Sequence, residues 1–287
     1  MEITVRPKPV TEKEATPLVQ QTTYWARVKQ QQGCHTRVFD INMIEQPACC
    51  SDSGNCTCAA HDDLLVVFRR INSQMQMAYV PYGPNLLPEQ EDRGTFLEEL
   101  SETLRPFLPD DCLMIRYDLA WESPWAEDEH FSNHYWEGPP EPRVQEMRMN
   151  FATKNFNLRK APTDILPTNT IFMNLKKDSD MLLRRMKPKT RYNINLAKRR
   201  GVNVHEVDHN NLAVWYGLYR ETAQRNHINN QGIEYFQSVL NTRATDSHSP
   251  ARVHLRLAEA QGHALAGLFQ EKGQHICMVR PRREKET

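Results

Sequence analysis

The side chains with the clearest chemical potential lie in one basic stretch, KPKTRYNINLAKRRG, at positions 187–201. Helical spacing places Arg191, Asn195 and Lys198 on one face of the helix expected there. An arginine near a helix N-terminus adds its guanidinium to free backbone N–H groups and the positive end of the helix dipole, a combination that suits a phosphate. The alternative, which the sequence leaves open, is a solvated helix face or one docked on an acidic region.

Charge is distributed unevenly along this chain. The 36 Lys and Arg residues balance the 36 Asp and Glu residues, so net charge does not point to a nucleic-acid partner. Residues 176–200, however, carry ten basic side chains and two acidic ones, whereas residues 86–150 carry sixteen acidic and five basic ones. Local positive potential steers anions even on a neutral protein, so the basic segment favours a phosphate-bearing ligand.

Four cysteines, Cys49, Cys50, Cys56 and Cys58, lie within ten residues, with His61 close by. Four thiolates can hold zinc, but this spacing lacks the paired C-x-x-C pattern of zinc knuckles. We therefore expect a surface loop at 46–61 with free thiols and no metal. The sequence also lacks a P-loop, G-x-G-x-x-G, G-x-S-x-G and H-E-x-x-H, and we expect no cofactor. The R/Q-x-x-G-x-G/A loop of acetyl-CoA enzymes is absent as well, which disfavours an ordinary acetyltransferase.

A chain of 287 residues is long for one domain and sufficient for two. With 39% hydrophobic and 25% charged residues it can form a packed core. The mean hydropathy is −0.70, and no apolar run approaches the roughly 18–20 residues of a membrane span. The start, MEITVRPKPVTEKEA, lacks the apolar run of a secretory signal, so we expect a cytoplasmic protein with reduced thiols.

The elements that must position these side chains alternate between strands and helices, which predicts two α/β units. The expected strands span 38–43, 64–71, 75–80, 112–119, 170–175, 202–207, 253–258 and 264–269, and the expected helices span 18–32, 94–107, 178–186, 190–200, 211–225 and 233–240. The second unit begins near Pro162. A stretch rich in Trp, Pro and acids at 120–146 is expected to be a long loop or an insertion.

Several motifs, in order over most of 17–267, carry a family resemblance. QQTTYWARVKQQQG resembles the Q-x-x-x-W-x-x-x-K-x-x-x-G pattern of the Fem family (FemA, FemB, FemX), the aminoacyltransferases of peptidoglycan bridges, and supplies Gln21, Trp25, Lys29 and Gly33. AYVPYGPNL resembles the family's Y-x-P-x-G-P turn, and LMIRYDLAWE its strand ending in an acidic residue, here Asp118. KPKTRYNINLAKRRGV is similar to its K-x-R-x-N-I-x-x-A-x-x-x-G-V helix, and YRETAQRNHI followed by EYF is similar to the downstream pair.

The resemblance implies an α/β (α+β) fold with two GNAT-like acyltransferase domains, at 1–161 and 162–287. It implies transfer of an amino acid from aminoacyl-tRNA to an amine on a lipid-linked or nucleotide-linked peptidoglycan precursor. The protein would act as a monomer, with peripheral contact with the inner membrane face allowed. The alternative is a catalytically degenerate relative that binds phosphate, tRNA or a muropeptide.

The resemblance also assigns candidate site residues. Lys29 and Arg191 correspond to contacts with precursor phosphates, and Tyr235, in EYF, to an aromatic lining the same pocket. Asp118 corresponds to an acidic residue near the reacting amine, the candidate catalytic group. The alternatives are an exposed helix lysine for Lys29, a turn residue at a strand end for Asp118 and a core aromatic for Tyr235.

The C-terminal segment departs from the family pattern. After GHALAG the family continues through a strand, a glycine-rich segment and an F-K-x-x-F string, to whose lysine the resemblance assigns polarisation of the acyl carbonyl. This chain instead runs LFQEKGQHICMVRPRREKET, which resembles a truncated or frame-shifted end. We therefore expect an incomplete second domain and weak or absent catalysis.

Overall fold

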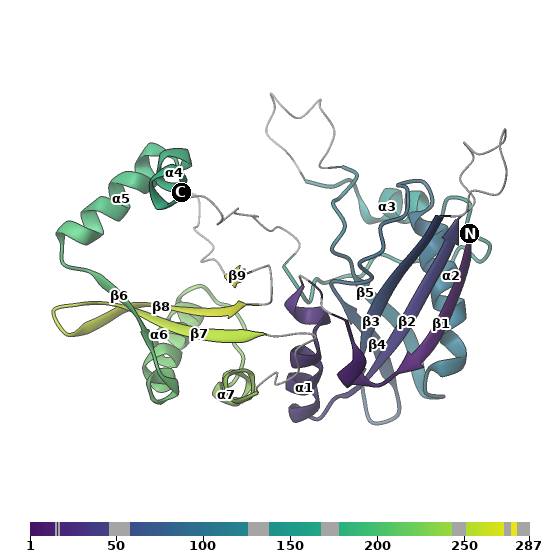
Figure 1. The fold of residues 1–287 in the computed structure, drawn as a ribbon, viewed down its shortest axis with the longest axis horizontal. Helices are drawn as coiled ribbons and strands as arrows, with labels where there is room; N and C mark the ends of the chain where they lie inside the picture. The colour runs from purple at the N-terminus through teal and green to yellow at the C-terminus, as the bar shows by residue number, and fades with distance from the viewer. Residues whose placement is uncertain are drawn as a thin grey trace. The chain divides into compact units, whose positions relative to one another are not determined.

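The computed structural model describes residues 1–14, 16, 18–45, 58–125, 138–167, 178–242, 251–272 and 277–279 (Figure 1). Its internal contacts divide these residues into two compact units. Unit 1 holds the described residues up to Pro167, and unit 2 holds those from Asp178 onward. The architecture is mixed α/β as expected, and the domain boundary at 161/162 stays a prediction. That each unit is a GNAT-like domain stays a prediction.

Unit 1 is built on a five-stranded sheet in the order β1-β2-β3-β4-β5 (Figure 1). The strands are Glu2–Lys8 (β1), His35–Glu45 (β2), Cys58–Arg70 (β3), Gln76–Pro81 (β4) and Cys112–Asp118 (β5). Strands β1 to β4 pair antiparallel, whereas β4 and β5 pair parallel. The parallel pair requires a crossover connection, and helix α2 (Arg93–Leu104), between β4 and β5 in the chain, supplies it.

The sheet of unit 1 is covered by helices on its two faces. On one face Phe39, Ile41 and Leu64 pack with Phe96 and Leu100 of helix α2 (Arg93–Leu104), and all five are 0% exposed. Side chains alternate along a strand, so the buried neighbours of these strand residues point to the opposite face. There helix α1 (Thr23–Gln31) contacts β2 and β3. Unit 1 also contains helix α3 (Pro142–Met149) and the 3-10 helices Val10–Glu12, Val19–Gln21 and Arg105–Phe107.

Unit 2 contains a smaller antiparallel sheet in the order β6-β7-β8-β9. Its strands are Asn203–Val207 (β6), Arg252–Ala260 (β7), His263–Lys272 (β8) and Cys277–Val279 (β9). Gln261 and Gly262 join β7 to β8 with φ values of 51° and 76°. Two successive positive φ values match the twist of a tight hairpin, and a glycine adopts such a value without strain.

The helices of unit 2 are Ser179–Arg185 (α4), Pro188–Arg199 (α5), Leu212–Arg225 (α6) and Ile233–Asn241 (α7), with a 3-10 helix at His209–Asn211. An aromatic cluster joins α6, α7 and β8: the Phe236 ring lies 4.8 Å from Trp215 and 5.3 Å from Phe269, centroid to centroid. Gly267 permits this packing, because a Cβ there would lie 2.3 Å from Trp215 Cδ1. Helices α4 and α5, by contrast, contain no buried residue.

Several sequence expectations are corrected by the structure. Strand β3 begins at Cys58, inside the loop expected at 46–61, and helix α3 begins at Pro142, inside the loop expected at 120–146. The predicted strand at 170–175 and the cysteines Cys49, Cys50 and Cys56 lie outside the described residues. Among the helices that the structure describes, none is long and apolar enough to span a membrane.

Candidate functional site

The four predicted site residues divide equally between the two units. Lys29 and Asp118 belong to unit 1, on α1 and at the end of β5. Arg191 and Tyr235 belong to unit 2, on α5 and α7. The structure therefore defines the surroundings of each residue within its own unit.

Lys29 is positioned by the buried face of α1. Thr22 caps this helix, because its Oγ1 accepts a hydrogen bond from Trp25 N at 3.2 Å. One turn later the Lys29 ammonium lies 4.6 Å from the centroid of the Trp25 ring, which is only 4% exposed. Lys29 Nζ also donates to Gln32 Oε1 at 2.9 Å. The helix thus holds a positive charge over an aromatic face in its last turn, where the helix dipole also favours a cation.

Two sequence motifs meet at the start of this helix. Gln21, which is 2% exposed, accepts from Leu65 N at 2.8 Å and donates to the Pro81 carbonyl at 2.7 Å. Gly83 lies against the same amide, since a Cβ there would be 2.8 Å from Gln21 Nε2. The Gln21-to-Trp25 motif and the turn at 79–84 therefore pack against each other, and these contacts fix α1 on the sheet.

Asp118 is held by three donors at the end of β5. Its Oδ2 accepts from Tyr79 Oη at 2.9 Å and from Leu166 N at 3.0 Å, and its Oδ1 accepts from Arg116 Nε at 3.1 Å. The side chain is 13% exposed. Burial, reinforced by the Asp118 charge, raises the pKa of Tyr79 far above its ordinary value, so Tyr79 remains a donor. The arrangement positions an anionic carboxylate with most of its acceptor capacity occupied.

Arg191 closes the junction between α4 and α5. Its Nη1 donates to the Arg184 carbonyl at 2.8 Å and to the Met186 carbonyl at 3.1 Å. These carbonyls lie at the C-terminal end of α4, where a positive charge is favoured. Within the described part of the chain, Nη2 and Nε make no hydrogen bond, so the fixed guanidinium keeps one edge for a further acceptor. No side chain caps the α5 N-terminus beside it.

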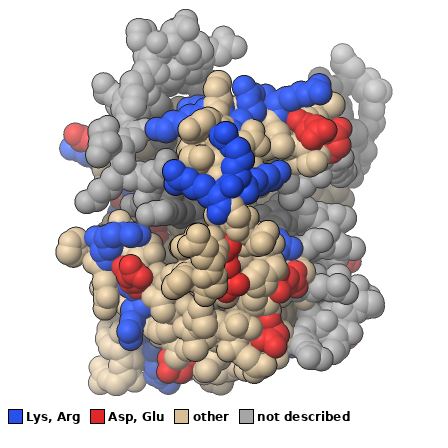
Figure 2. Space-filling model, turned by 90° about the vertical axis from the view of Figure 1, so that its left-hand side faces the viewer, with Lys and Arg blue, Asp and Glu red and all other residues tan. Residues whose placement is uncertain are grey.

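The segment around Arg191 presents an exposed basic surface. Figure 2 shows Lys and Arg gathered over the part of unit 2 that contains α5. The exposed basic residues of these two helices and their ends are Arg184, Arg185, Lys187, Lys189, Lys198, Arg199 and Arg200. Among the described residues, none of these seven forms an ion pair with a carboxylate. Their charge is therefore available to an anionic ligand.

Tyr235 lies half-buried on α7 beside the aromatic cluster. Its ring meets Phe236 edge to face at 5.2 Å between centroids. A hollow in the same unit is lined by His209, Leu212, Ile233, Gln237 and their neighbours. Neither Tyr235 nor Arg191 lines this hollow, so its lining offers no support for the predicted phosphate site.

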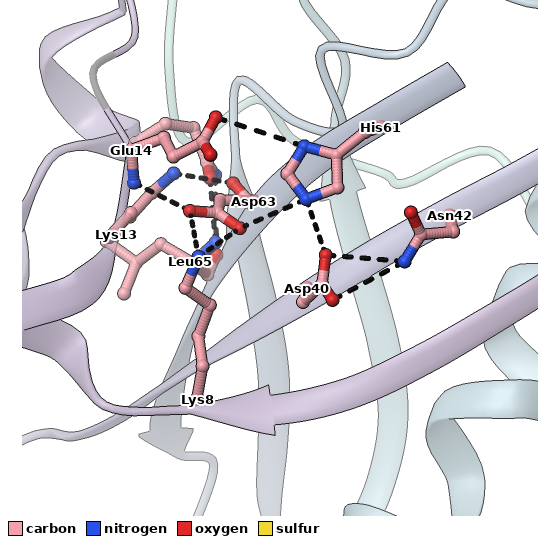
Figure 3. A network of polar contacts seen from close by, with 9 residues as sticks. Lys8, Lys13, Glu14, Asp40, Asn42, His61, Asp63 and Leu65 are labelled. Atoms are coloured by element: carbon pink, nitrogen blue, oxygen red, sulfur yellow. Dashed lines mark hydrogen bonds and ion pairs between the residues drawn. The ribbon is translucent and has the colours of Figure 1, made fainter. Parts of the chain in front are cut away.

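A polar network on the unit 1 sheet was not anticipated from the sequence (Figure 3). Asp63, 2% exposed at its side chain, accepts from Lys8 Nζ at 2.8 Å, and His61 Nε2 lies 2.5 Å from Asp40 Oδ1. Lys13 Nζ, almost fully buried, donates to the Asp63 carbonyl at 2.5 Å. Burial lowers the pKa of Lys13 to about 8, opposed by the nearby carboxylates. The two-residue spacing of His61 and Asp63 within one strand was the available signal, because it places both on one face.

Comparisons with known proteins address the fold and the family of the chain. The crystal structure of FemX is similar with a TM-score of 0.52 at 17% sequence identity, over 87% of this chain and 54% of that one. This chain thus spans about half the length of FemX, and the likeness concerns the fold. A search of curated proteins finds no match. A family model described as FemAB matches residues 10–261. The chain therefore belongs to the FemAB family.

Proposed function

We propose that this protein transfers an amino acid from aminoacyl-tRNA to the side-chain amine of a peptidoglycan precursor. FemAB family membership over 10–261 supports the reaction class. The observation that carries the proposal is the fixed guanidinium of Arg191 within the most basic part of the chain, with Nη1 held by two carbonyls. A preoriented cation binds a phosphate without the cost of ordering a mobile side chain.

The reaction requires positioning and proton transfer by the protein. The acceptor amine attacks the ester carbonyl of the aminoacyl-tRNA, an amide bond forms, and the C–O bond to the tRNA ribose breaks. The amine loses a proton, and the ribose oxygen gains one as it leaves. Holding both substrates in one orientation supplies a large part of such an acceleration. In this proposal Lys29 and Arg191 each bind a precursor phosphate, Tyr235 contacts the precursor, and Asp118 receives the amine proton.

The surroundings of Asp118 also favour a second candidate function. A general base needs a lone pair directed at the proton it takes, and three donors already contact the two oxygens of Asp118. This arrangement supports a positioning role for Asp118, and it favours a relative that binds precursor phosphates without transfer. Binding and turnover must therefore be measured separately.

The test follows a labelled amino acid from charged tRNA to a nucleotide-linked or lipid-linked precursor, together with calorimetric binding of the nucleotide-linked precursor. Transfer that falls in Arg191→Ala, while Arg220→Ala stays near wild type, supports the transferase, because Arg220 is an exposed arginine of α6 outside the basic surface. Binding that depends on Arg191 without detectable transfer supports the second candidate. Affinity and transfer equal to wild type in Arg191→Ala would remove Arg191 from the site.

A further inference from the structure

We propose that Asp40, His61 and Asp63 form a binding site for a divalent transition-metal ion, with zinc the best chemical match (Figure 3). The register of the β2–β3 pair places Asp40 opposite Asp63 and Asn42 opposite His61. Opposite residues of an antiparallel pair share a face, as do residues two apart in one strand. Two strands therefore direct one imidazole and two carboxylates to the same place, independently of the transferase proposal.

The spacing of the three ligand atoms suits a single ion. His61 Nε2 lies 2.5 Å from Asp40 Oδ1 and 4.0 Å from Asp63 Oδ1, and the ligand atoms of all three residues lie within 4.8 Å of one another. Zinc bonds of about 2.0–2.2 Å to nitrogen and oxygen place tetrahedral ligands roughly 3.3–3.5 Å apart. The two observed separations bracket that value, so small side-chain rotations bring the set to coordination geometry.

Outer contacts hold the three ligands in these directions. Asp63 Oδ2 accepts from Glu14 N at 2.6 Å, which leaves Oδ1 as the atom facing His61. The second imidazole nitrogen, Nδ1, lies 3.9 Å from Glu14 Oε2. Asn42 Nδ2 lies 3.4 Å from each oxygen of Asp40. Metal-bound histidines typically direct their other nitrogen at a carboxylate, and metal-bound carboxylates typically accept further hydrogen bonds.

The carboxylates of the cluster attract a cation, and lysine and arginine side chains lie nearby. Three carboxylates surround the imidazole, and the ammonium in contact with them is Lys8, whose Nζ lies 2.9 Å from Asp63 Oδ1 and 2.8 Å from Oδ2. Lys13 donates to the Asp63 backbone carbonyl, and its charge also interacts with the carboxylates of Asp62 and Asp63. Arg6 lies opposite Asp40 across the β1–β2 pair. An ion can take Oδ1 of Asp63 while Lys8 keeps Oδ2.

The types of ligand atom determine which metal ion binds, and the position of the site determines what binding does to the fold. An imidazole with two carboxylates suits zinc, whereas calcium and magnesium prefer oxygen ligands alone. An ion bound here joins β2 to β3 near the end of the pair that leads into the cysteine-rich connection at 46–57. Because the folded state brings the three ligands together, the ion raises the thermal stability of the chain, by an amount that grows with the logarithm of its concentration above the dissociation constant.

The experiment must first separate this site from the nearby thiols. A chain with Cys49, Cys50, Cys56 and Cys58 all replaced by Ser is stripped with chelator, dialysed, and titrated calorimetrically with zinc. We expect one equivalent of zinc to bind and the melting temperature to rise. Cobalt titrated in place of zinc should give visible d–d bands without a thiolate charge-transfer band. No binding by this four-serine chain would overturn the proposal.

Variants in the same four-serine chain then locate the ion. We expect His61→Ala to weaken zinc binding by more than about tenfold and Glu14→Gln, behind the imidazole, by about tenfold or more. His35→Ala is the matched control, because His35 is an exposed histidine of β2 outside the cluster. If His61→Ala loses its far-UV dichroism, the isosteric Asp40→Asn decides. Zinc affinity unchanged in both His61→Ala and Asp40→Asn would overturn the proposal.

Discussion

The two helices that carry the predicted phosphate-binding cations are held in place by different means. In unit 1, α1 buries Trp25 and Val28 against the sheet, and Lys29 lies over the Trp25 ring. In unit 2, α5 has no buried residue, and Arg191 is held by two backbone carbonyls at the end of α4. The position of Lys29 thus depends on the core, whereas that of Arg191 depends on local hydrogen bonds. Substitutions on α1 should therefore change the stability of the protein as well as ligand binding, whereas substitutions on α5 should change mainly ligand binding.

The largest expected effect comes from Trp25→Ala. Removing this ring, 4% exposed, should lower the free energy of unfolding by about 3–5 kcal/mol, because the cavity cannot close around a packed helix. Tyr192→Ala on α5 is the matched control, since Tyr192 is 57% exposed and its loss should change stability by less than about 0.5 kcal/mol. Urea unfolding followed by circular dichroism measures both. Equal destabilisation by the two would remove the contrast between the helices.

A buried cation distinguishes unit 1 from the exposed basic surface of unit 2. The Lys13 pKa is lowered from 10.5 to about 8 by burial, so the folded state binds fewer protons than the unfolded state between these values. Stability attributable to Lys13 is fully present above pH 10.5 and is lost as pH falls through 8.

Lys13→Met removes this titration. Relative to that variant, the wild type should gain on the order of 2–3 kcal/mol as the pH rises from about 7.5 to 10.5. Unfolding in urea with chelator present, at several pH values in this window, gives the difference. A difference between the two proteins that does not vary with pH would show that Lys13 is charged in the fold throughout.

The strands around the cores follow from the sequence, whereas some boundaries do not. The apolar runs at 64–71 and 75–80 predict β3 and β4, and the strands expected at 253–258 and 264–269 are present as β7 and β8, which pair antiparallel. Strand β1 was missed although Ile3 and Val5 alternate with polar residues, because two apolar positions before Pro7 are a short signal, and its pairing with β2 decides its conformation. The first residues of β3 were missed for the same reason, since a partner strand overrides weak local preference.

The candidate site was predictable only where one helix defines it. Helical spacing and motif order placed Lys29 and Arg191 on helices, as observed. The carbonyls that hold Arg191 depend on the α4–α5 junction, and the meeting of Asp40 with Asp63 depends on strand register. The spacing of residues along the sequence does not show either relation. The first depends on the turn between α4 and α5, and the second depends on how β2 pairs with β3.

The next largest effect concerns Arg191. Arg191→Ala should weaken binding of a nucleotide-linked muropeptide by roughly 10–150-fold, the equivalent of losing a charged hydrogen bond of about 1.5–3 kcal/mol. Arg191→Lys should restore little of this affinity, because one ammonium cannot bond to the α4 carbonyls and to a phosphate in the geometry that a guanidinium allows. Calorimetric titration measures both variants. Full recovery by lysine would show that Arg191 acts as a point charge.

The smallest effect is expected from the opposite exchange in unit 1. Lys29 lies 4.6 Å from the Trp25 ring centroid, and arginine also stacks on aromatic rings. Lys29→Arg should therefore keep the charge over Trp25 and change precursor affinity by less than about threefold. Lys29→Met keeps the length of the side chain but loses the charge, and should weaken binding by about tenfold or more through the lost phosphate contact. The same titration compares them. If Lys29→Arg binds as poorly as Lys29→Met, the contact requires the compact ammonium, and Lys29 is then as geometrically constrained by its ligand as Arg191.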